Sequence, residues 1–71
     1  MRQFTVELDV EILAESEEAI KVQVSDTEEP VWLPRSQIDE RLSELNPYKC
    51  QAGDQGTLYI PEWLATNKGL I

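Results

Sequence analysis

The sequence predicts a mainly β protein: a small antiparallel meander curled into an SH3-like or OB-like barrel, with one short helix and a C-terminal helical turn. Three observations predict this class. Apolar and polar residues alternate with period two near the N-terminus, short polar connections separate the alternating runs, and one later segment has helical spacing instead. A chain of 71 residues is expected to form a single domain, 1–71.

Four runs carry the strand pattern: QFTVELDVEI (3–12), AIKVQVS (19–25), VWL (31–33) and TLYIP (57–61). The first run is expected to turn five apolar side chains inward: Phe4, Val6, Leu8, Val10 and Ile12. Pro34 ends the third strand because proline has no N–H to donate to a sheet. We expect Leu8, Val22 and Leu58, each in the middle of a strand, to lie in the core.

The alternation stops in SQIDERLSEL (36–45), where apolar residues recur with the spacing of one helix face. The residues that share this face are Ile38, Leu42 and Leu45. Ser36, followed three residues later by Asp39, has capping-box-like spacing and is the expected N-cap.

A final helical turn is predicted in PEWLATNKG (61–69), with Pro61 at its first position and Gly69 at its C-cap. Trp63 is expected to form a lid over one end of the barrel together with Leu64 and the last two residues. A ligand contact through Trp63 is the alternative. The fold also has an alternative, an open curved sheet packed on one helix, because either arrangement covers the apolar face of the sheet.

Composition excludes several kinds of chemistry. The chain has 14 acidic and 6 basic side chains, for a net charge of −8, so direct binding to a nucleic-acid backbone is not expected. It has no histidine and one cysteine, Cys50, which removes the common general base and the usual zinc ligands. We therefore expect no enzyme activity, no metal site and no cofactor.

The single Cys50 cannot form an internal disulfide, which favours a reducing compartment. We expect it to be a bystander in a polar turn, with the preceding Lys49 lowering the pKa of its thiol a little. No apolar run has the length of a signal peptide or a membrane span, so a cytoplasmic protein without membrane contact is expected.

The stretch VWLPRSQI (31–38) places a tryptophan next to one of the few cations, at the end of a strand. One interpretation is an exposed recognition patch, because tryptophan and arginine are enriched at binding hot spots. Its residues would be Trp32, Arg35, Ser36 and Gln37. The other interpretation is that Trp32 only closes the end of the barrel, as aromatic residues often do in small cores.

A second candidate surface is the polar side of the first strand. Glu7, Asp9 and Glu11 recur at every second residue, which spaces them by about 6.6 to 6.8 Å. That spacing is close to the phosphate spacing of extended nucleic acid, so these acids are a possible nucleic-acid-mimic face. A charged strand face that only keeps the protein in solution is the alternative.

Two segments carry a resemblance: VWLPRSQI and the ending IPEWLATNKGL, with a Gly-Asp turn between them. In this plan the chain resembles an uncharacterised family of small proteins from bacteriophages, prophages and microbial genomes. The matching positions carry no assigned roles: Trp32, Pro34, Arg35, Ser36, Gln37, Gly53, Asp54, Pro61 and Trp63. The resemblance implies a mobile-element setting, near replication or recombination genes or among small anti-defence proteins.

Together these features predict a non-catalytic binding module that acts on a protein or a nucleic-acid-processing complex through the Trp32, Arg35 and Gln37 end. The first alternative is an acidic nucleic-acid mimic of the anti-defence type, which would use Glu7, Asp9 and Glu11. The second is a sponge for a small nucleotide, held by Arg35, Ser36 and Gln37 with Trp32 stacked on its base. A protein partner is expected in the leading hypothesis, and the sequence assigns no oligomeric state.

Overall fold

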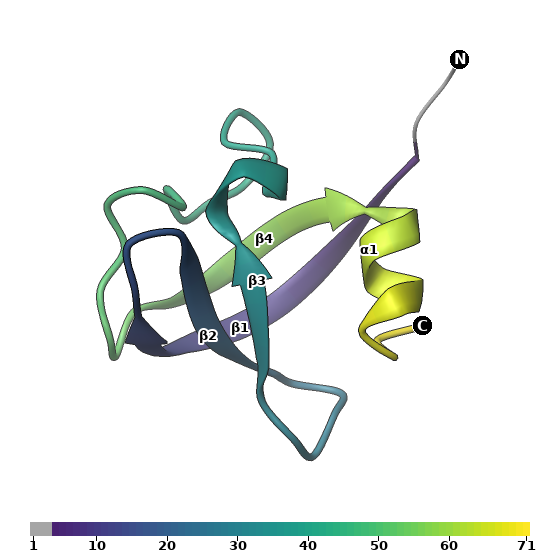
Figure 1. Cartoon of the computed structure of the whole chain (residues 1–71), viewed down its shortest axis with the longest axis horizontal. Coiled ribbons are helices and arrows are strands. Elements are labelled where there is room, and N and C mark those ends of the chain that lie inside the picture. Colours follow the sequence, from purple (N-terminus) through teal and green to yellow (C-terminus); the bar gives the residue numbers. More distant parts are fainter. Residues whose placement is uncertain (1–3) are drawn as a thin grey trace.

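Four antiparallel strands form one sheet in the order β3-β2-β1-β4 (Figure 1), as seen in a computed structural model that describes residues 4–71. The elements are β1 (Thr5–Glu15), β2 (Ala19–Val24), β3 (Val31–Pro34), the 3-10 turn η1 (Arg35–Gln37), β4 (Gln55–Pro61) and α1 (Glu62–Asn67). The mainly β class with a C-terminal helical turn is confirmed. The strongly curved sheet is consistent with a small barrel-like fold.

The long strand β1 organises the sheet. Its N-terminal part pairs with β4 from Thr5 to Glu11, and its C-terminal part pairs with β2 from Val10 to Glu15. The register shifts between Ile12 and Ala14, and bulges of this kind bend a strand and increase its twist. Figure 1 shows β4 running alongside β1 while the β2–β3 hairpin crosses them.

The core lies on the inner face of this curved sheet. Leu8, Val22 and Leu58 are buried there, as the alternation predicted. The remaining core residues come from all four strands, from α1 and from the connection between η1 and β4: Val10, Ile12, Ile20, Val24, Leu33, Ile38, Cys50, Ile60, Leu64 and Ala65. Phe4 is the exception to the predicted pattern, because 62% of its surface is exposed.

The predicted helix over residues 36–45 is wrong. The segment contains only the short η1 turn followed by irregular turns, and Leu42 on its predicted apolar face is exposed. Its backbone instead covers the outer edge of β4. The N–H of Asp39 donates to the carbonyl of Tyr59 over 2.8 Å, and the N–H of Glu44 donates to the carbonyl of Thr57 over 3.0 Å. Covering an exposed edge strand prevents unwanted pairing with other chains, so tertiary contacts outweigh the helical spacing here.

The expected cap at Ser36 is also wrong. No side-chain hydrogen bond caps η1, and the side-chain cap lies instead at Asp39, before the turn over residues 40–42. One carboxylate oxygen of Asp39 accepts the backbone N–H groups of Arg41 and Leu42, over 2.9 and 3.0 Å. Aspartate commonly caps a helical turn in this way.

Helix α1 ends as the sequence predicts. Gly69 has a positive φ of 73°, and its N–H donates to the carbonyl of Thr66 while the N–H of Leu70 donates to that of Ala65. These two bonds form a Schellman motif, in which glycine is favoured because it adopts positive φ without strain. Pro61 precedes the helix as its N-cap residue rather than as its first helical position.

The expected lid is only partly correct, because Leu64 is buried and Leu70 packs against the core as predicted, but Trp63 and Ile71 are exposed. Leu64 and Ala65 are buried against the core, whereas Trp63 is 52% exposed. A helix of six residues turns only one side toward the sheet, and Trp63 lies on the other side. Among residues 4–71, no helix is long and apolar enough to cross a membrane.

Candidate functional site

Arg35 is not part of an exposed patch, which corrects the sequence-based expectation. Only 8% of its surface is exposed, and its guanidinium group donates to two backbone carbonyls. Nε and Nη2 reach the carbonyl of Ser16 over 3.2 and 2.6 Å, and Nη1 reaches that of Pro47 over 2.9 Å. Nη2 also lies 3.9 Å from a carboxylate oxygen of Glu15. The hydrogen bonds of this side chain therefore link the β1–β2 turn to the connection that follows η1.

This geometry removes the cation that the nucleotide-sponge hypothesis needs. Ser36 and Gln37 are exposed next to Arg35, but they belong to a 3-10 turn of three residues. With the guanidinium engaged by Ser16 and Pro47, the arrangement offers no free positive charge to a phosphate.

Trp32 faces outward, because Val31 and Leu33 on either side of it turn toward the core. It is 43% exposed, while the next residue, Leu33, is completely buried on the opposite face of the strand. Trp32 pairs across the sheet with Lys21 of β2. The N–H of Arg35 donates to the carbonyl of Glu18 over 2.9 Å, so Arg35 and Glu18 form a hydrogen-bonded pair three positions along the same two chain segments. Because bonded pairs alternate along an antiparallel ladder, the Trp32–Lys21 pair is a non-hydrogen-bonded one, in which side chains lie closest together.

The Trp32 position and the acidic strand face belong to one continuous surface. Two residues beyond Lys21 on β2 lies Gln23, which pairs with Glu11 of β1. Residues two apart on a strand point to the same face, so the two cross-strand pairs form neighbouring rows. We call this surface the outer face and define it by six residues: Glu7, Asp9, Glu11, Lys21, Gln23 and Trp32.

Glu7, at one end of the outer face, already has a partner. It pairs across the sheet with Tyr59 of β4, whose hydroxyl donates to a Glu7 carboxylate oxygen over 2.8 Å. This hydrogen bond, with a smaller contribution from burial and from the negative charge of Glu7, raises the pKa of Tyr59 above its ordinary value. The hydrogen bond from Tyr59 therefore holds the Glu7 side chain in place. Asp9 and Glu11 form no ion pair with a described residue.

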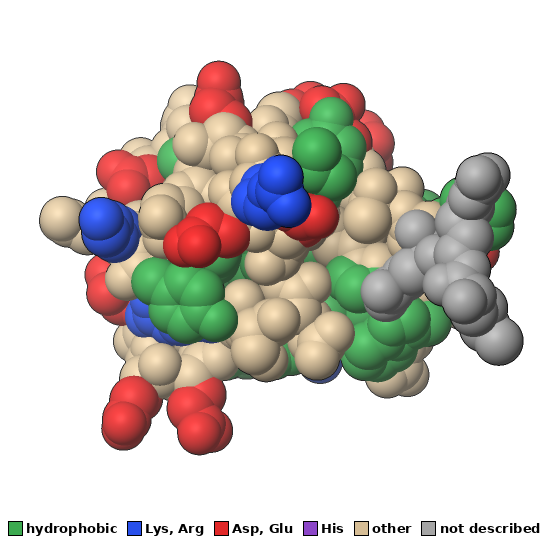
Figure 2. All heavy atoms as spheres, turned by 90° about the horizontal axis from the view of Figure 1, so that it is seen from above, with side chains coloured by type: hydrophobic (Ala, Val, Ile, Leu, Met, Phe, Trp, Pro, Cys, Tyr) green, Lys and Arg blue, Asp and Glu red, His purple; other side chains and the backbone are tan. Residues whose placement is uncertain are grey.

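Negative charge dominates the surface of the chain. Among residues 4–71 there is one ion pair, between Arg35 and Glu15. Asp9 is exposed and Glu11 is half-buried, and neither pairs with a cation within the described chain. Figure 2 shows acidic side chains around one face of the molecule and apolar side chains gathered in separate patches.

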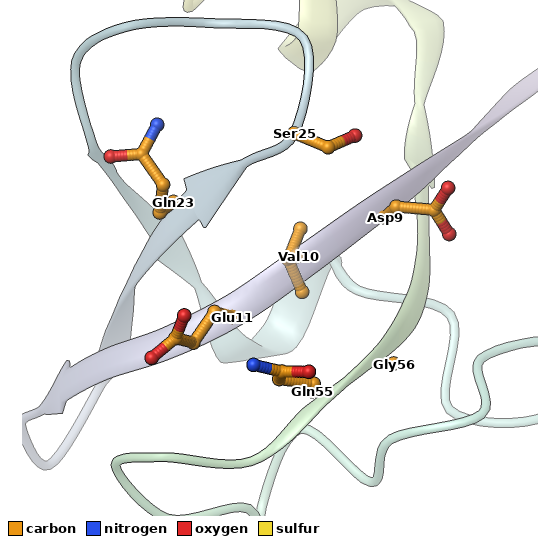
Figure 3. A pocket seen from close by; sticks show the side chains of 7 residues that line it. All are labelled: Asp9, Val10, Glu11, Gln23, Ser25, Gln55 and Gly56. Carbon is orange, nitrogen blue, oxygen red and sulfur yellow. The ribbon is translucent and has the colours of Figure 1, made fainter.

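A hollow of about 380 Å³ opens beside the acidic residues (Figure 3). It lies where β1 passes between the end of β2 and the start of β4. Its wall consists of Asp9, Val10, Glu11, Gln23, Ser25, Gln55 and Gly56. Three of these residues, Asp9, Glu11 and Gln23, belong to the outer face, so the hollow and the Trp32 row are parts of one candidate site.

A second hollow, of about 350 Å³, lies near η1 and includes Pro34, Ser36 and the exposed Tyr48. Cys50 is nearby but buried, with its sulfur 4.0 Å from the carbonyl of Pro47. Burial raises the pKa of the Cys50 thiol, and the positive charge of Arg35 opposes this only in part. Cys50 is therefore a core residue and not a bystander in a polar turn, and Lys49 is not among the groups that shift its pKa.

Sequence reasoning did not identify Lys21, Gln23 or Tyr59 as members of a site. Each was placed on a strand, but the cross-strand partners depend on the register, which the bulge between Ile12 and Ala14 changes. Only knowledge of which residues pair across the strands could have placed these three residues in the site. A shift of one residue in that pairing moves every side chain of a strand to its other face.

The fold and this site define the chain as a small mainly β protein with an acidic outer face that carries one exposed tryptophan, Trp32. Comparisons with protein-family models, curated proteins and solved structures found no match for the chain.

Proposed function

We propose that this chain is a non-catalytic, cytoplasmic binding module, associated with a mobile element, that contacts a protein through its outer face. The observation that supports it is the position of Trp32, which is 43% exposed in a row next to the acidic residues. Tryptophan is the residue type most enriched at energetic centres of interfaces, where acidic neighbours select a cationic partner. A protein that processes nucleic acid carries such a cationic surface.

The absence of catalysis in this proposal follows from the side chains present. The sequence has no histidine, and its one thiol is buried with a raised pKa. A thiol is a poor nucleophile under these conditions because the thiolate is the reactive form. Asp9 and Glu11 line a hollow that is wide open to solvent, and Glu7 lies on the strand surface, so none of the three sits in an enclosed cleft of the kind that acid–base catalysis uses.

The proposed contact uses side chains and not strand addition. The outer edge of β4 already receives hydrogen bonds from the segment around Asp39 and Glu44. At the other edge of the sheet, β3 has four residues and is bounded by Pro30 and Pro34, which have no N–H to offer. A partner strand would find almost no free backbone donors at either edge.

Trp32→Ala, compared with Trp63→Ala, tests the proposal. Both tryptophans are about half exposed, so neither substitution should unfold the protein, and Trp63→Ala is a matched control on α1. We expect an immobilised protein to capture a partner from lysate of its natural host, identified by mass spectrometry. Trp63→Ala should keep this partner, and Trp32→Ala should lose affinity for it by about 30-fold, which corresponds to about 2 kcal/mol. Equal capture by both variants would contradict the proposal.

The acidic nucleic-acid mimic is retained as a second candidate, favoured by the outward, regularly spaced carboxylates of Glu7, Asp9 and Glu11. Here the partner's own nucleic acid should compete with the protein. Replacing Glu7 and Glu11 with lysine should abolish capture, and wild-type capture should weaken steeply with added salt. Capture that survives both the double charge reversal and high salt would exclude the mimic and leave the Trp32 contact.

A further inference from the structure

We propose that the hollow near η1 receives a proline-rich segment of a partner protein, in the polyproline II conformation and with a lysine or arginine beside its prolines. This inference goes beyond the proposed function, because the hollow lies outside the outer face. The hollow has a volume of about 350 Å³, and its wall comes from the β1–β2 turn, the end of β3, η1 and the connection to β4: Glu17, Glu18, Pro34, Arg35, Ser36 and Tyr48.

Arg35 fixes the two sides of this hollow relative to each other. Its guanidinium donates to the carbonyl of Ser16, which directly precedes Glu17, over 2.6 Å. It also donates to the carbonyl of Pro47, which directly precedes Tyr48, over 2.9 Å. The acidic side and the aromatic side of the hollow are thus joined through one buried side chain. Because the wall is already held together, a ligand has little of it to order on binding.

The aromatic side of the hollow suits proline rings. Tyr48 is 57% exposed although it is one of the largest side chains of the protein, and the half-buried Pro34 belongs to the same wall. Proline-rich segments dock on exposed aromatic side chains of this kind. Their polyproline II helix is already formed in the free segment, so that they lose little conformational entropy when they bind.

The polar groups of the wall favour this backbone over a helix or a strand. Tyr48 and Ser36 are exposed residues whose hydroxyls can donate, and the carbonyls of polyproline II are free to accept because that helix has no internal hydrogen bonds. In an α-helix the carbonyls are bonded internally, and its diameter of about 10–12 Å is too wide for a hollow of about 350 Å³. A strand would need a free sheet edge, whereas this wall offers side chains.

The charge of the wall explains the lysine or arginine of the segment. Glu17 and Glu18 are exposed, and neither forms an ion pair with a cation among residues 4–71. Arg35 is the cation of the wall, but only 8% of its surface is exposed. The charge that the hollow presents to solvent is therefore negative, and a cation beside the prolines complements it. The two acids add selectivity to a site that Tyr48 and Pro34 define.

Titration of the isotope-labelled full-length chain with a hexaproline peptide that carries an arginine at each end, followed by NMR, tests this inference. We expect saturable shifts of the backbone signals of Glu17, Ser36 and Tyr48. A hexaalanine peptide with the same two arginines should not give this pattern. Tyr48→Ala should weaken binding of the proline peptide about ten-fold, and Tyr48→Phe, which keeps the ring, should recover most of the loss.

The matched control is Leu42→Ala, which truncates another exposed side chain of the same connection and should leave the titration unchanged. Equal binding of the hexaalanine peptide, unsaturable shifts, or equal effects of Tyr48→Ala and Leu42→Ala would each overturn the inference.

The double variant Glu17→Gln, Glu18→Gln tests the cation. Wild type should bind the peptide with arginine ends more tightly than a hexaproline peptide with glutamine ends, and the double variant should lose this preference. A preference that the double variant keeps would show that the acidic side does not meet the cation. The titrations are independent of the capture experiment with Trp32→Ala, so failure of either removes only the proposal that it tests.

Discussion

The guanidinium of Arg35 donates two hydrogen bonds to the carbonyl of Ser16, from Nε over 3.2 Å and from Nη2 over 2.6 Å. With the bond from Nη1 to Pro47, this side chain joins three segments that are distant in sequence: the β1–β2 turn, η1 and the connection to β4. The bonds satisfy carbonyls that the fold partly removes from water, and a buried carbonyl without a donor is costly. A residue expected to bind a partner is thus part of the framework.

Replacing Arg35 with alanine should destabilise the protein by about 2–3 kcal/mol, because the buried carbonyl of Pro47 and the partly buried carbonyl of Ser16 would lose charged donors. Arg35→Lys should recover part of this loss, since an ammonium cannot reproduce the planar fork. Urea unfolding followed by circular dichroism measures the change. Arg41→Ala, which removes an exposed cation, serves as the control and should leave the unfolding midpoint unchanged. An unchanged midpoint for Arg35→Ala would show that these bonds add nothing to stability.

The burial of Arg35 could not be predicted from local sequence. Its acceptors, the carbonyls of Ser16 and Pro47, are 19 and 12 residues away in the sequence. They come close to Arg35 only once the connection between η1 and β4 has folded across the β1–β2 turn. Alternation predicted the faces of β1 and β2 because a period of two depends on neighbours alone. It overestimated the inward run at Phe4, which lies one residue before β1 begins.

Asp39, and not Ser36, should carry the capping energy of its segment. The Asp39 carboxylate accepts two backbone N–H groups, whereas η1 has no side-chain cap. Asp39→Ala should therefore cost about 1 kcal/mol, and Ser36→Ala should change stability by much less. Thermal or urea unfolding of the two variants side by side makes the comparison. A larger loss for Ser36→Ala than for Asp39→Ala would reverse this assignment.

Truncation of the central core side chain Leu58 should nearly unfold the protein. Leu58 is fully buried and pairs with Leu8 across β1 and β4, so Leu58→Ala should cost about 2–5 kcal/mol. A domain of this size has little stability to spare. Leu42→Ala is the matched control, because Leu42 is 53% exposed and makes no part of the core. Comparable losses in the two variants, measured by urea unfolding, would contradict the inner-face assignment.

The motif positions of the sequence divide between framework and surface. Gly53 has a φ of 97° and Asp54 accepts the N–H of Gln51 over 2.8 Å, so both shape the turn before β4. Trp32 and Trp63 are the exposed aromatic members, and Ser36 and Gln37 are exposed as well. Strand alternation gives Trp32 the opposite direction to Val31 and Leu33, which turn toward the core. The closeness of Trp32 to the acidic residues was not predictable, because it depends on which residues face each other across β1, β2 and β3.

The contact between Tyr59 and Glu7 should appear in the pH dependence of stability. The protonated hydroxyl of Tyr59 donates to Glu7, and this bond raises the pKa of Tyr59 above its ordinary value of 10.0. Because the folded pKa is the higher one, the stabilisation is fully present below the unfolded pKa and is lost as pH rises through the folded pKa. Wild type should therefore lose stability relative to Tyr59→Phe as the pH rises above about 10.

The absorbance of tyrosinate during an alkaline titration measures the pKa directly. Tyr48→Phe provides a background in which Tyr59 is the only tyrosine. In that background, Glu7→Gln should move the pKa of Tyr59 back toward its ordinary value, because the neutral amide accepts a weaker bond and no longer repels the phenolate. Glu62→Gln, which changes an exposed acid on α1, should leave the titration where it is. If Glu7→Gln leaves it there as well, the Tyr59–Glu7 bond is too weak in solution to fix Glu7 on the outer face, and all three acidic residues of that face are then free to meet a partner.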